Sequence, residues 1–227
     1  MSWVVDNWDR IAGYALAHVA LSVPPILVGL ALSLPLGWLA NRFQATRGAL
    51  LAIGGVLYAI PSLPLFVVLP SIIGTRVLDP VNVVVALSLY ALALMLRTTA
   101  DGLAAVDRDV VLSATAAGYG AWRRFWTVEL PLAGPVILAG LRVVSVSTVS
   151  LVTVGSVIGV GSLGYFFLDG YQRAFPTEIL VGLVGTVLIA LVLDGLLVLA
   201  GRLLLPWARR ERTVGRAAIL ARTVSEA

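Results

Sequence analysis

The chain of 227 residues is 59% hydrophobic and only 12% charged, with a mean hydropathy of +0.99. A typical soluble domain is roughly 45–50% apolar and about 25% charged, and a soluble fold of this size could not cover so much apolar surface. Composition therefore excludes an ordinary soluble enzyme, a disordered chain and a disulfide scaffold. It predicts an all-α protein that crosses a membrane several times.

Charge and ligand chemistry narrow the function further. The net charge of +4 comes from 16 basic residues, all of them arginine, and 12 acidic residues. The chain has no cysteine and a single histidine, His18, which excludes thiolate metal sites, Cys nucleophiles and His-based clusters or triads. We expect no metal site, no cofactor in this chain and no catalytic residue, and we expect His18 to be a packed helix residue.

Five long stretches with few charges predict five transmembrane helices, because about 20 apolar residues cross the hydrocarbon core of a bilayer. In chain order these spans cover residues 13–40, 49–74, 81–98, 134–158 and 179–202. Residues 162–169 are too few to cross and predict an additional re-entrant half-helix. Prolines inside the spans predict kinks, at Pro24, Pro25, Pro35, Pro61 and Pro64.

The arginines predict the orientation. With five spans, twelve arginines fall on one side of the membrane and three on the other, while Arg142 lies inside a span. Cytoplasmic loops carry the excess of positive charge. We therefore expect an external N-terminus (residues 1–12), a transmembrane domain (residues 13–202) and a basic cytoplasmic tail (residues 203–227).

The long connection over residues 98–133 is expected to carry function, since loops of this length usually do. A helix is predicted over 110–117, with Asp107 and Asp109 as N-terminal caps or dipole partners. A sharp turn at Gly118 and Gly120 follows, and then a second helix over 121–129 that ends at Leu130-Pro131. One apolar face of that second helix is formed by Trp122, Phe125, Trp126 and Glu129. The segment is either a docking element or an interfacial helix with tryptophans at the lipid headgroups.

Two further groups lie inside the spans. Arg142 and Asp194 are ionisable residues at membrane depth, where charge is expensive; they form either a structural pair or a proton relay. The fourth span also carries a polar stripe in which Ser147, Ser150 and Thr153 lie three residues apart. These three either line a transport pathway or pack against neighbouring helices.

The loop resembles the cytoplasmic loop of type I ABC importer permeases, which reads Glu-Ala-Ala-x3-Gly-x9-Ile-x-Leu-Pro. Here Gly118 is followed by nine residues and then Val128-Glu129-Leu130-Pro131, and Leu112 stands in place of the family's Glu. Four segments are most similar to permeases for glycine betaine, choline and other osmoprotectants: residues 18–40, 59–66, 116–142 and 154–170.

The resemblance implies an architecture and partners. Two permease subunits, identical or homologous, would form one pathway in a bacterial-type plasma membrane, and an external binding protein would deliver a small compatible solute such as glycine betaine, choline, carnitine or proline. A cytoplasmic ATPase, which binds the ATP and Mg, would receive the loop at about 107–131. The loop residues implied to couple to it are Ala114, Gly118, Gly120, Trp122, Val128, Glu129, Leu130 and Pro131.

The chain cannot itself be the ATPase, because it contains no lysine and hence no Gly-x4-Gly-Lys-[Ser/Thr] phosphate loop. Three alternatives stay open on the sequence. They are a permease of the same architecture for an amino acid such as methionine, an ion-coupled secondary transporter, and a membrane scaffold without transport.

Overall fold

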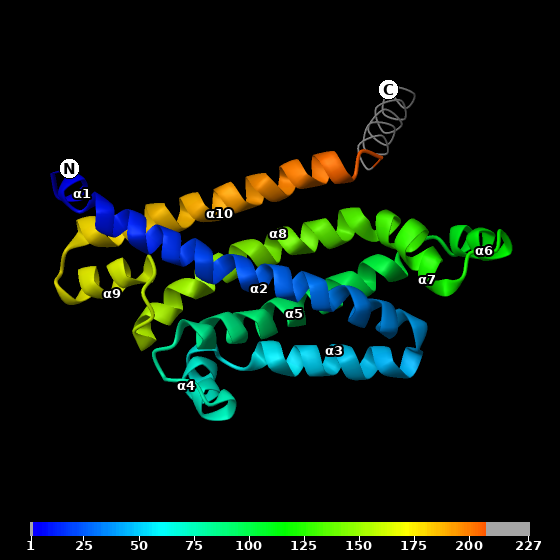
Figure 1. Ribbon diagram of the computed structural model, residues 1–227, viewed down its shortest axis with the longest axis horizontal. Helices are drawn as coiled ribbons and strands as arrows, with labels where there is room; N and C mark the ends of the chain where they lie inside the picture. The colour runs from blue at the N-terminus through cyan, green and yellow to red at the C-terminus, as the bar shows by residue number, and fades with distance from the viewer. Residues whose placement is uncertain (1, 208–227) are drawn as a thin grey trace, which may run out of the picture.

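Four long helices run along the molecule in the computed structural model, which describes residues 2–207 (Figure 1). They are α2 (Trp8–Arg42), α5 (Pro80–Ala104), α8 (Leu130–Gly155) and α10 (Pro176–Leu204). The shorter helices are α1 (Ser2–Asp6), α3 (Gln44–Ala59), α4 (Ser62–Ile73), α6 (Arg108–Ala116), α7 (Ala121–Arg124), α9 (Gly164–Gln172), the π-helix η1 (Phe125–Glu129) and the 3₁₀-helix η2 (Ser156–Ile158). Within the described range there is no strand. Most of the predicted basic tail, residues 208–227, lies outside that range.

Four of the five predicted spans are confirmed as single crossings. They lie within α2, α5, the continuous helical run Ala121–Ile158, and α10. The helices extend beyond the apolar windows; α5, for example, continues past residue 98 to Ala104. Charged residues near a helix end lie where the bilayer gives way to headgroups and water, so the apolar window marks membrane thickness and not helix length.

The second predicted span, residues 49–74, is wrong as one continuous helix. The structure divides it into α3 and α4, which are bent by 104° relative to each other. Pro61 is the first residue outside α4, and Ile60 before it is extended, with φ −67° and ψ 126°. A residue that precedes proline avoids the helical region, so the predicted kink at Pro61 becomes a break. The prolines of α2 lie inside an uninterrupted helix.

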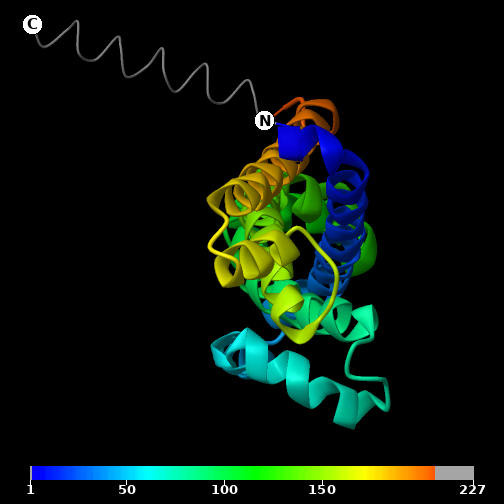
Figure 2. The same cartoon turned by 90° about the vertical axis from the view of Figure 1, so that its left-hand side faces the viewer.

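The half-helix predicted at residues 162–169 corresponds to α9, whose nine residues are too short to cross a bilayer. Helix α9 and α1 lie at one end of the molecule, which we call the α9 end (Figure 1). Helices α6 and α7 lie at the opposite end, which we call the α6 end. Viewed end-on, α10 and the α3–α4 pair lie on opposite sides of the bundle (Figure 2).

Helix α5 forms the centre and contacts α2, α3, α4 and α8. Two glycines allow its close approach to α2. A Cβ atom on Gly29 would lie 2.6 Å from the Ala91 Cβ, and one on Gly37 would lie 2.7 Å from the Thr99 Cγ2. Both pairs advance in the same direction along the two helices, so α2 and α5 run parallel. Small residues at such contacts are typical of membrane helices, where close packing drives association.

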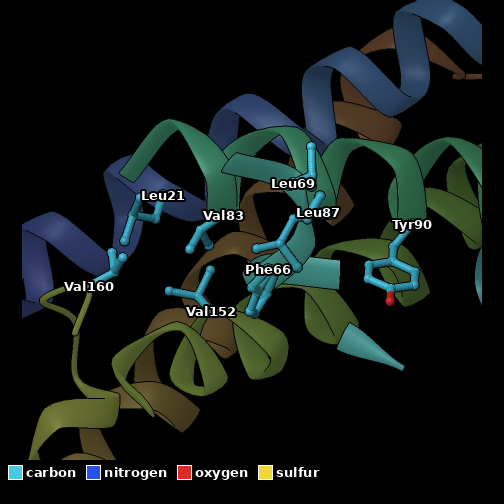
Figure 3. Close-up of a cluster of buried hydrophobic side chains, with 9 residues drawn as sticks. Leu21, Phe66, Leu69, Val83, Leu87, Tyr90, Val152 and Val160 are labelled. Carbon is cyan, nitrogen blue, oxygen red and sulfur yellow. The ribbon is translucent and has the colours of Figure 1, made fainter. Parts of the chain in front are cut away.

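Two apolar clusters surround this centre. The cluster nearer the α9 end joins α2, α4, α5 and α8 around the fully buried side chain of Phe66 (Figure 3). The second cluster includes Met95 of α5 and Phe125 of η1. A polar link adds to them, because the Nε2 atom of buried His18 lies 3.0 Å from the Val149 carbonyl oxygen. A carbonyl can only accept, so Nε2 donates, and His18 is a packed helix residue as predicted.

Candidate functional site

Helix α6 opens the connection after α5 and is capped as the sequence predicts. The Asp107 carboxylate accepts a hydrogen bond from the backbone N–H of Asp109 at 2.8 Å. Asp109 lies in the first turn, where a negative charge complements the helix dipole. No residue of α6 is buried, so the whole helix projects from the bundle at the α6 end (Figure 1).

Gly118 ends α6 in the left-handed region, with φ +84°. The N–H of Tyr119 donates to the Ala114 carbonyl at 3.1 Å, and the N–H of Gly118 donates to the Thr115 carbonyl at 3.0 Å. These two bonds form a Schellman C-cap, which favours glycine at the left-handed position. Gly120, by contrast, has φ −65° and ψ 159°, a conformation open to any residue. Of the two glycines predicted to make the turn, Gly118 alone is required by its φ.

The predicted helix end at Leu130-Pro131 is wrong. Helix α7 passes through η1 into α8, and Pro131 lies in the first turn of α8. The N–H of Leu130 donates to the carbonyl of Phe125, five residues back. A wide π-turn at this point shifts the hydrogen-bond register, and proline is tolerated in a first helical turn. The loop is thus joined to the fourth span without a break.

The predicted apolar face of the second helix forms only in part. Phe125 is 2% exposed, whereas Trp122 is 65% exposed and Trp126 is 45% exposed. The side chain of Glu129 forms an ion pair. Because the π-turn changes the angular spacing, the 3.6-residue pattern does not place all four residues on one buried face. The rings still cluster edge-to-face with Trp38 of α2, at centroid distances of 6.5 Å to Trp122 and 6.2 Å to Phe125.

Arg124 holds the loop in shape, and the sequence reasoning missed it. Its Nε donates to Glu129 Oε1 at 2.6 Å, and its Nη1 donates to Thr115 Oγ1 at 2.6 Å. One guanidinium therefore ties α6 to η1. Leu112, which replaces the acid of the resembled motif, is 56% exposed; in this chain Glu129 supplies a carboxylate within the loop.

The remaining predicted loop residues lie around the start of α8. Val128 and Pro131 line an open hollow of about 260 Å³ together with Trp207, which follows α10. The indole Nε1 of Trp207 donates to the Pro131 carbonyl at 3.3 Å. Leu130 and Ala114 are half-buried.

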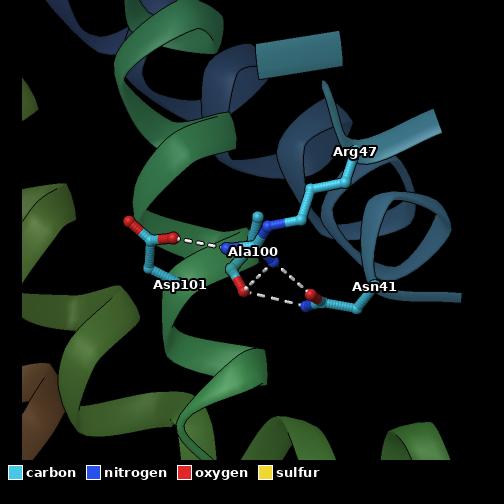
Figure 4. Close-up of polar contacts among 4 residues, drawn as sticks. All are labelled: Asn41, Arg47, Ala100 and Asp101. Atoms are coloured by element: carbon cyan, nitrogen blue, oxygen red, sulfur yellow. Dashed lines mark hydrogen bonds and ion pairs between the residues drawn. The ribbon is translucent and has the colours of Figure 1, made fainter. Parts of the chain in front are cut away.

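The base of the loop is fixed by contacts between two segments that lie more than 50 positions apart in the chain, so no local sequence pattern predicts them (Figure 4). Arg47 donates to Asp101 Oδ1 at 2.7 Å and to the Ala100 carbonyl at 3.3 Å. Asn41 donates to the same carbonyl at 2.8 Å and also accepts from Arg47. The turn between α2 and α3 is thereby tied to the last turns of α5.

Helix α8 presents polar groups on its outer face at membrane depth. Arg142 donates to Asp194 of α10 through two parallel bonds, Nε to Oδ1 at 2.6 Å and Nη2 to Oδ2 at 2.7 Å. The pair is accessible, with the side chains 44% and 26% exposed. Arg142 lies about 18 Å along α8 from its first residue, at 1.5 Å per residue, which is close to the middle of the helix.

The predicted polar stripe of α8 is divided between two environments. Ser150 is exposed, and Ser147 and Thr153 are half-buried. Ser145 and Thr148 are buried against the bundle. Ser150 and Thr153 share the outer face with Arg142 by helical periodicity, so three of the polar groups identified from the sequence lie on one side of α8.

Comparisons with known proteins agree with this architecture. Residues 29–210 match the family described as "Binding-protein-dependent transport system inner membrane component". The chain is 30% identical to the choline transport system permease protein OpuBB of Bacillus subtilis, over 83% of this chain and 86% of that one. It is 31% identical to the carnitine transport permease protein OpuCB of Listeria monocytogenes, over 92% and 95% of the two chains.

A solved structure, described as inward-facing conformations of the MetNI methionine ABC transporter, superposes with a TM-score of 0.67. It is 19% identical in sequence and covers 82% of this chain and 94% of that chain, so it supports the fold alone. The family match covers most of the chain, from α2 to beyond α10. The protein therefore belongs to the binding-protein-dependent transport system inner membrane components and is a permease subunit of a type I ABC importer.

Proposed function

We propose that this permease subunit imports a small compatible solute of the glycine betaine, choline, carnitine or proline type, delivered by an external binding protein. The observation that carries the proposal is the similarity to choline and carnitine permeases at 30% and 31% identity over most of the chain. The second permease subunit of the pathway is either an identical copy or a homologue.

The projecting element of α6, the Gly118 turn and α7 is the docking site for a cytoplasmic ATPase, which binds ATP and Mg. The support is its shape. It is capped at Asp107, turned at Gly118 and braced by Arg124, and it is exposed although ordered. The indoles of Trp122 and Trp126 are exposed and offer the ATPase an apolar contact of the kind enriched at protein interfaces. The coupling residues are Ala114, Gly118, Gly120, Trp122, Val128, Glu129, Leu130 and Pro131.

The outer face of α8 lines the translocation pathway. An accessible ion pair near the centre of a membrane helix is costly against hydrocarbon, and intramembrane charges usually face a water-filled cavity or the protein interior. Arg142, Ser150 and Thr153 share that face, and Ser147 lies at its edge. The bidentate geometry of Arg142 with Asp194 favours a structural pair over a proton relay.

The proposed orientation places the N-terminus outside and the C-terminus in the cytoplasm, as the arginine distribution indicates. The chain has no native cysteine, so single cysteines at Ser2 and Ser225 can be labelled without background. A membrane-impermeant maleimide added to intact cells is expected to label the Ser2 variant only. Labelling of the Ser225 variant alone would reverse the orientation.

The direct test is uptake in cells that lack their own osmoprotectant transporters. The chain is expressed with its cognate ATPase and binding protein, and uptake of radiolabelled choline, glycine betaine, carnitine, proline and methionine is measured. We expect ATP-dependent uptake of at least one of the first four. Uptake of methionine alone would establish the alternative, an amino-acid permease. Uptake without the ATPase would identify an ion-coupled transporter.

A further inference from the structure

Arg10 of α2 sits over three aromatic rings at the α9 end. Its guanidinium carbon lies 4.7 Å from the ring centroid of Tyr165, 5.9 Å from that of Tyr14 and 6.0 Å from that of Phe166. The rings come from two elements, Tyr14 from α2 and the other two from α9. A cation within about 6 Å of a ring centroid is attracted by the negative face of the ring.

The rings form a compact triangle. The centroid of Tyr14 lies 5.0 Å from that of Tyr165 and 5.3 Å from that of Phe166, and the last two are 5.9 Å apart. Tyr14 and Tyr165 are stacked, with 15° between their ring planes, and Phe166 is nearly perpendicular to both, at 89° and 81°. Arg10 is closest to Tyr165 and lies beside the stacked pair. Phe166 is fully buried and forms the floor. An open hollow of about 280 Å³, lined by Arg10, Gly13, Tyr14, Ala17 and Gly161, adjoins the triangle.

Arg10 is not fixed by an ion pair within the part of the chain that the structure describes. Each salt bridge at the α9 end involves Arg173, whose Nη1 lies 2.9 Å from Asp169 and 3.5 Å from Glu178. The hydrogen bond from Arg173 also holds the pKa of Asp169 below its usual value, so this carboxylate stays charged. Arg10 is exposed to solvent and is held chiefly by the rings, which makes it displaceable.

The two acids favour a cation at this end. Glu178 is fully buried, and neither of its carboxylate oxygens has a hydrogen-bond partner among the described residues. Asp169 lies four residues after Tyr165 on α9 and therefore on the same face of that helix. Of the two acids, Asp169 is the one that Arg173 holds charged, and it adds a negative charge beside the ring of Tyr165.

We propose that Tyr14, Tyr165 and Phe166 form a binding site for a quaternary ammonium group, and that Arg10 is its internal occupant, displaced when the solute arrives. Aromatic rings arranged around a cation are a recurrent way of recognising such groups. The inference rests on the proposed function and deepens it, since choline, glycine betaine and carnitine all carry a trimethylammonium group. In the proposed orientation the site opens to the side from which the binding protein delivers solute.

The test is equilibrium binding of radiolabelled choline to the purified full chain in lipid nanodiscs, repeated with unlabelled tetramethylammonium as competitor. Removing the internal occupant in Arg10→Ala is expected to tighten choline binding about two- to fivefold, the equivalent of one exposed cation–π contact. Tyr165→Leu is expected to abolish binding both alone and combined with Arg10→Ala, and Tyr165→Phe is expected to retain it. Arg76→Ala, which removes an exposed arginine that contacts neither the rings nor the two acids, is the matched control and is expected to give no tightening.

Two outcomes would overturn the inference. One is binding by Arg10→Ala that is equal to or weaker than that of the unmodified chain at an unchanged thermal midpoint. The other is binding that survives Tyr165→Leu. These results are separable from the transport assay. If the intact importer takes up choline but Arg10→Ala does not bind choline more tightly, the binding site is wrong and the proposed function stands. If Arg10→Ala binds choline more tightly but the importer takes up none of these solutes, the binding site is supported and the proposed function is wrong.

Discussion

Helices α5 and α10 both cross the membrane, yet they occupy opposite environments. The most apolar 18-residue stretch of α5 has a mean hydropathy of 1.8, and 56% of its residues are buried in the protein. The corresponding stretch of α10 has a mean hydropathy of 2.6, and 0% of its residues are buried. The more hydrophobic helix is thus the less covered one. In a soluble protein the order would be the reverse, because water drives apolar side chains inward.

This difference in burial shows that the hydrophobicity of a helix in this chain does not determine how deeply it is buried in the protein. Lipid tails are as apolar as leucine, so apolar surface gains little by moving from the bilayer into the protein. Helix α5 is instead held by close backbone approach, with Ala91 and Thr99 against the glycines of α2, and by polar contacts at its end. Helix α10 keeps long aliphatic side chains on its surface and one polar attachment near mid-helix, Asp194.

The largest expected effect is the loss of stability when a glycine at the contact between α2 and α5 is substituted, compared with a glycine substitution on α10. Gly29→Leu should prevent α2 from packing on α5, because even a Cβ would lie 2.8 Å from the Ala91 carbonyl carbon; overpacking typically costs about 1–3 kcal/mol, and we expect the upper end of that range here. A Cβ on Gly195 of α10 would meet nothing within 4 Å, so Gly195→Leu should be close to neutral. Thermal midpoints and the yield of monodisperse protein in detergent measure both. Equal tolerance of the two variants would contradict the close packing of α2 on α5.

A smaller effect is expected at the attachment of α10. Asp194→Leu leaves Arg142 unpaired near the middle of the membrane and should lower the thermal midpoint, because an unpartnered charge there is costly. The double variant Arg142→Leu with Asp194→Leu should recover most of that midpoint, since removing both charges leaves neither unpaired. Uptake by the double variant then separates the structural pair from the proton relay: retained uptake indicates the structural pair, and lost uptake at normal expression indicates the relay.

The smallest effect on stability is expected in the exposed loop that follows α5 in the chain, at Gly118. Gly118→Ala places a side chain at φ +84°, which should cost about 1–2 kcal/mol in the turn. Gly48→Ala on α3 is the control, because an added Cβ meets no atom within 4 Å at either glycine and Gly48 has no positive φ. Co-purification of the ATPase should fall for Gly118→Ala and stay normal for Gly48→Ala. Full ATPase association by a Gly118→Arg variant would argue strongly against the docking role.

The sequence predicted what depends on short-range patterns. Apolar windows located the crossings, and Asp107 and Gly118 located the ends of α6. Pro61 was predicted only as a kink, and it marks the place where the structure breaks the helix between α3 and α4. It could not predict the continuity of η1 with α8, because proline at position 131 is compatible either with a helix end or with a first helical turn. The cluster around Arg10 and the contact of Arg47 with Asp101 were equally beyond it, since their partners lie far apart in the chain. The acidic partners of Arg173 are nearer in sequence, but only the fold buries one of them, Glu178.

The continuous run from Ala121 to Ile158 has a mechanical consequence. Its 38 residues make a rod about 57 Å long at 1.5 Å per residue, with the indole-bearing turn at one tip and the polar outer face of α8 along its shaft. A tilt of about 5° applied at one tip moves the other by about 5 Å over that length. Between the tip and Arg142 the helical run is irregular only at the π-turn and at Pro131 and Pro135, so a displacement at the α6 end is expected to reach the level of Arg142 through one helix.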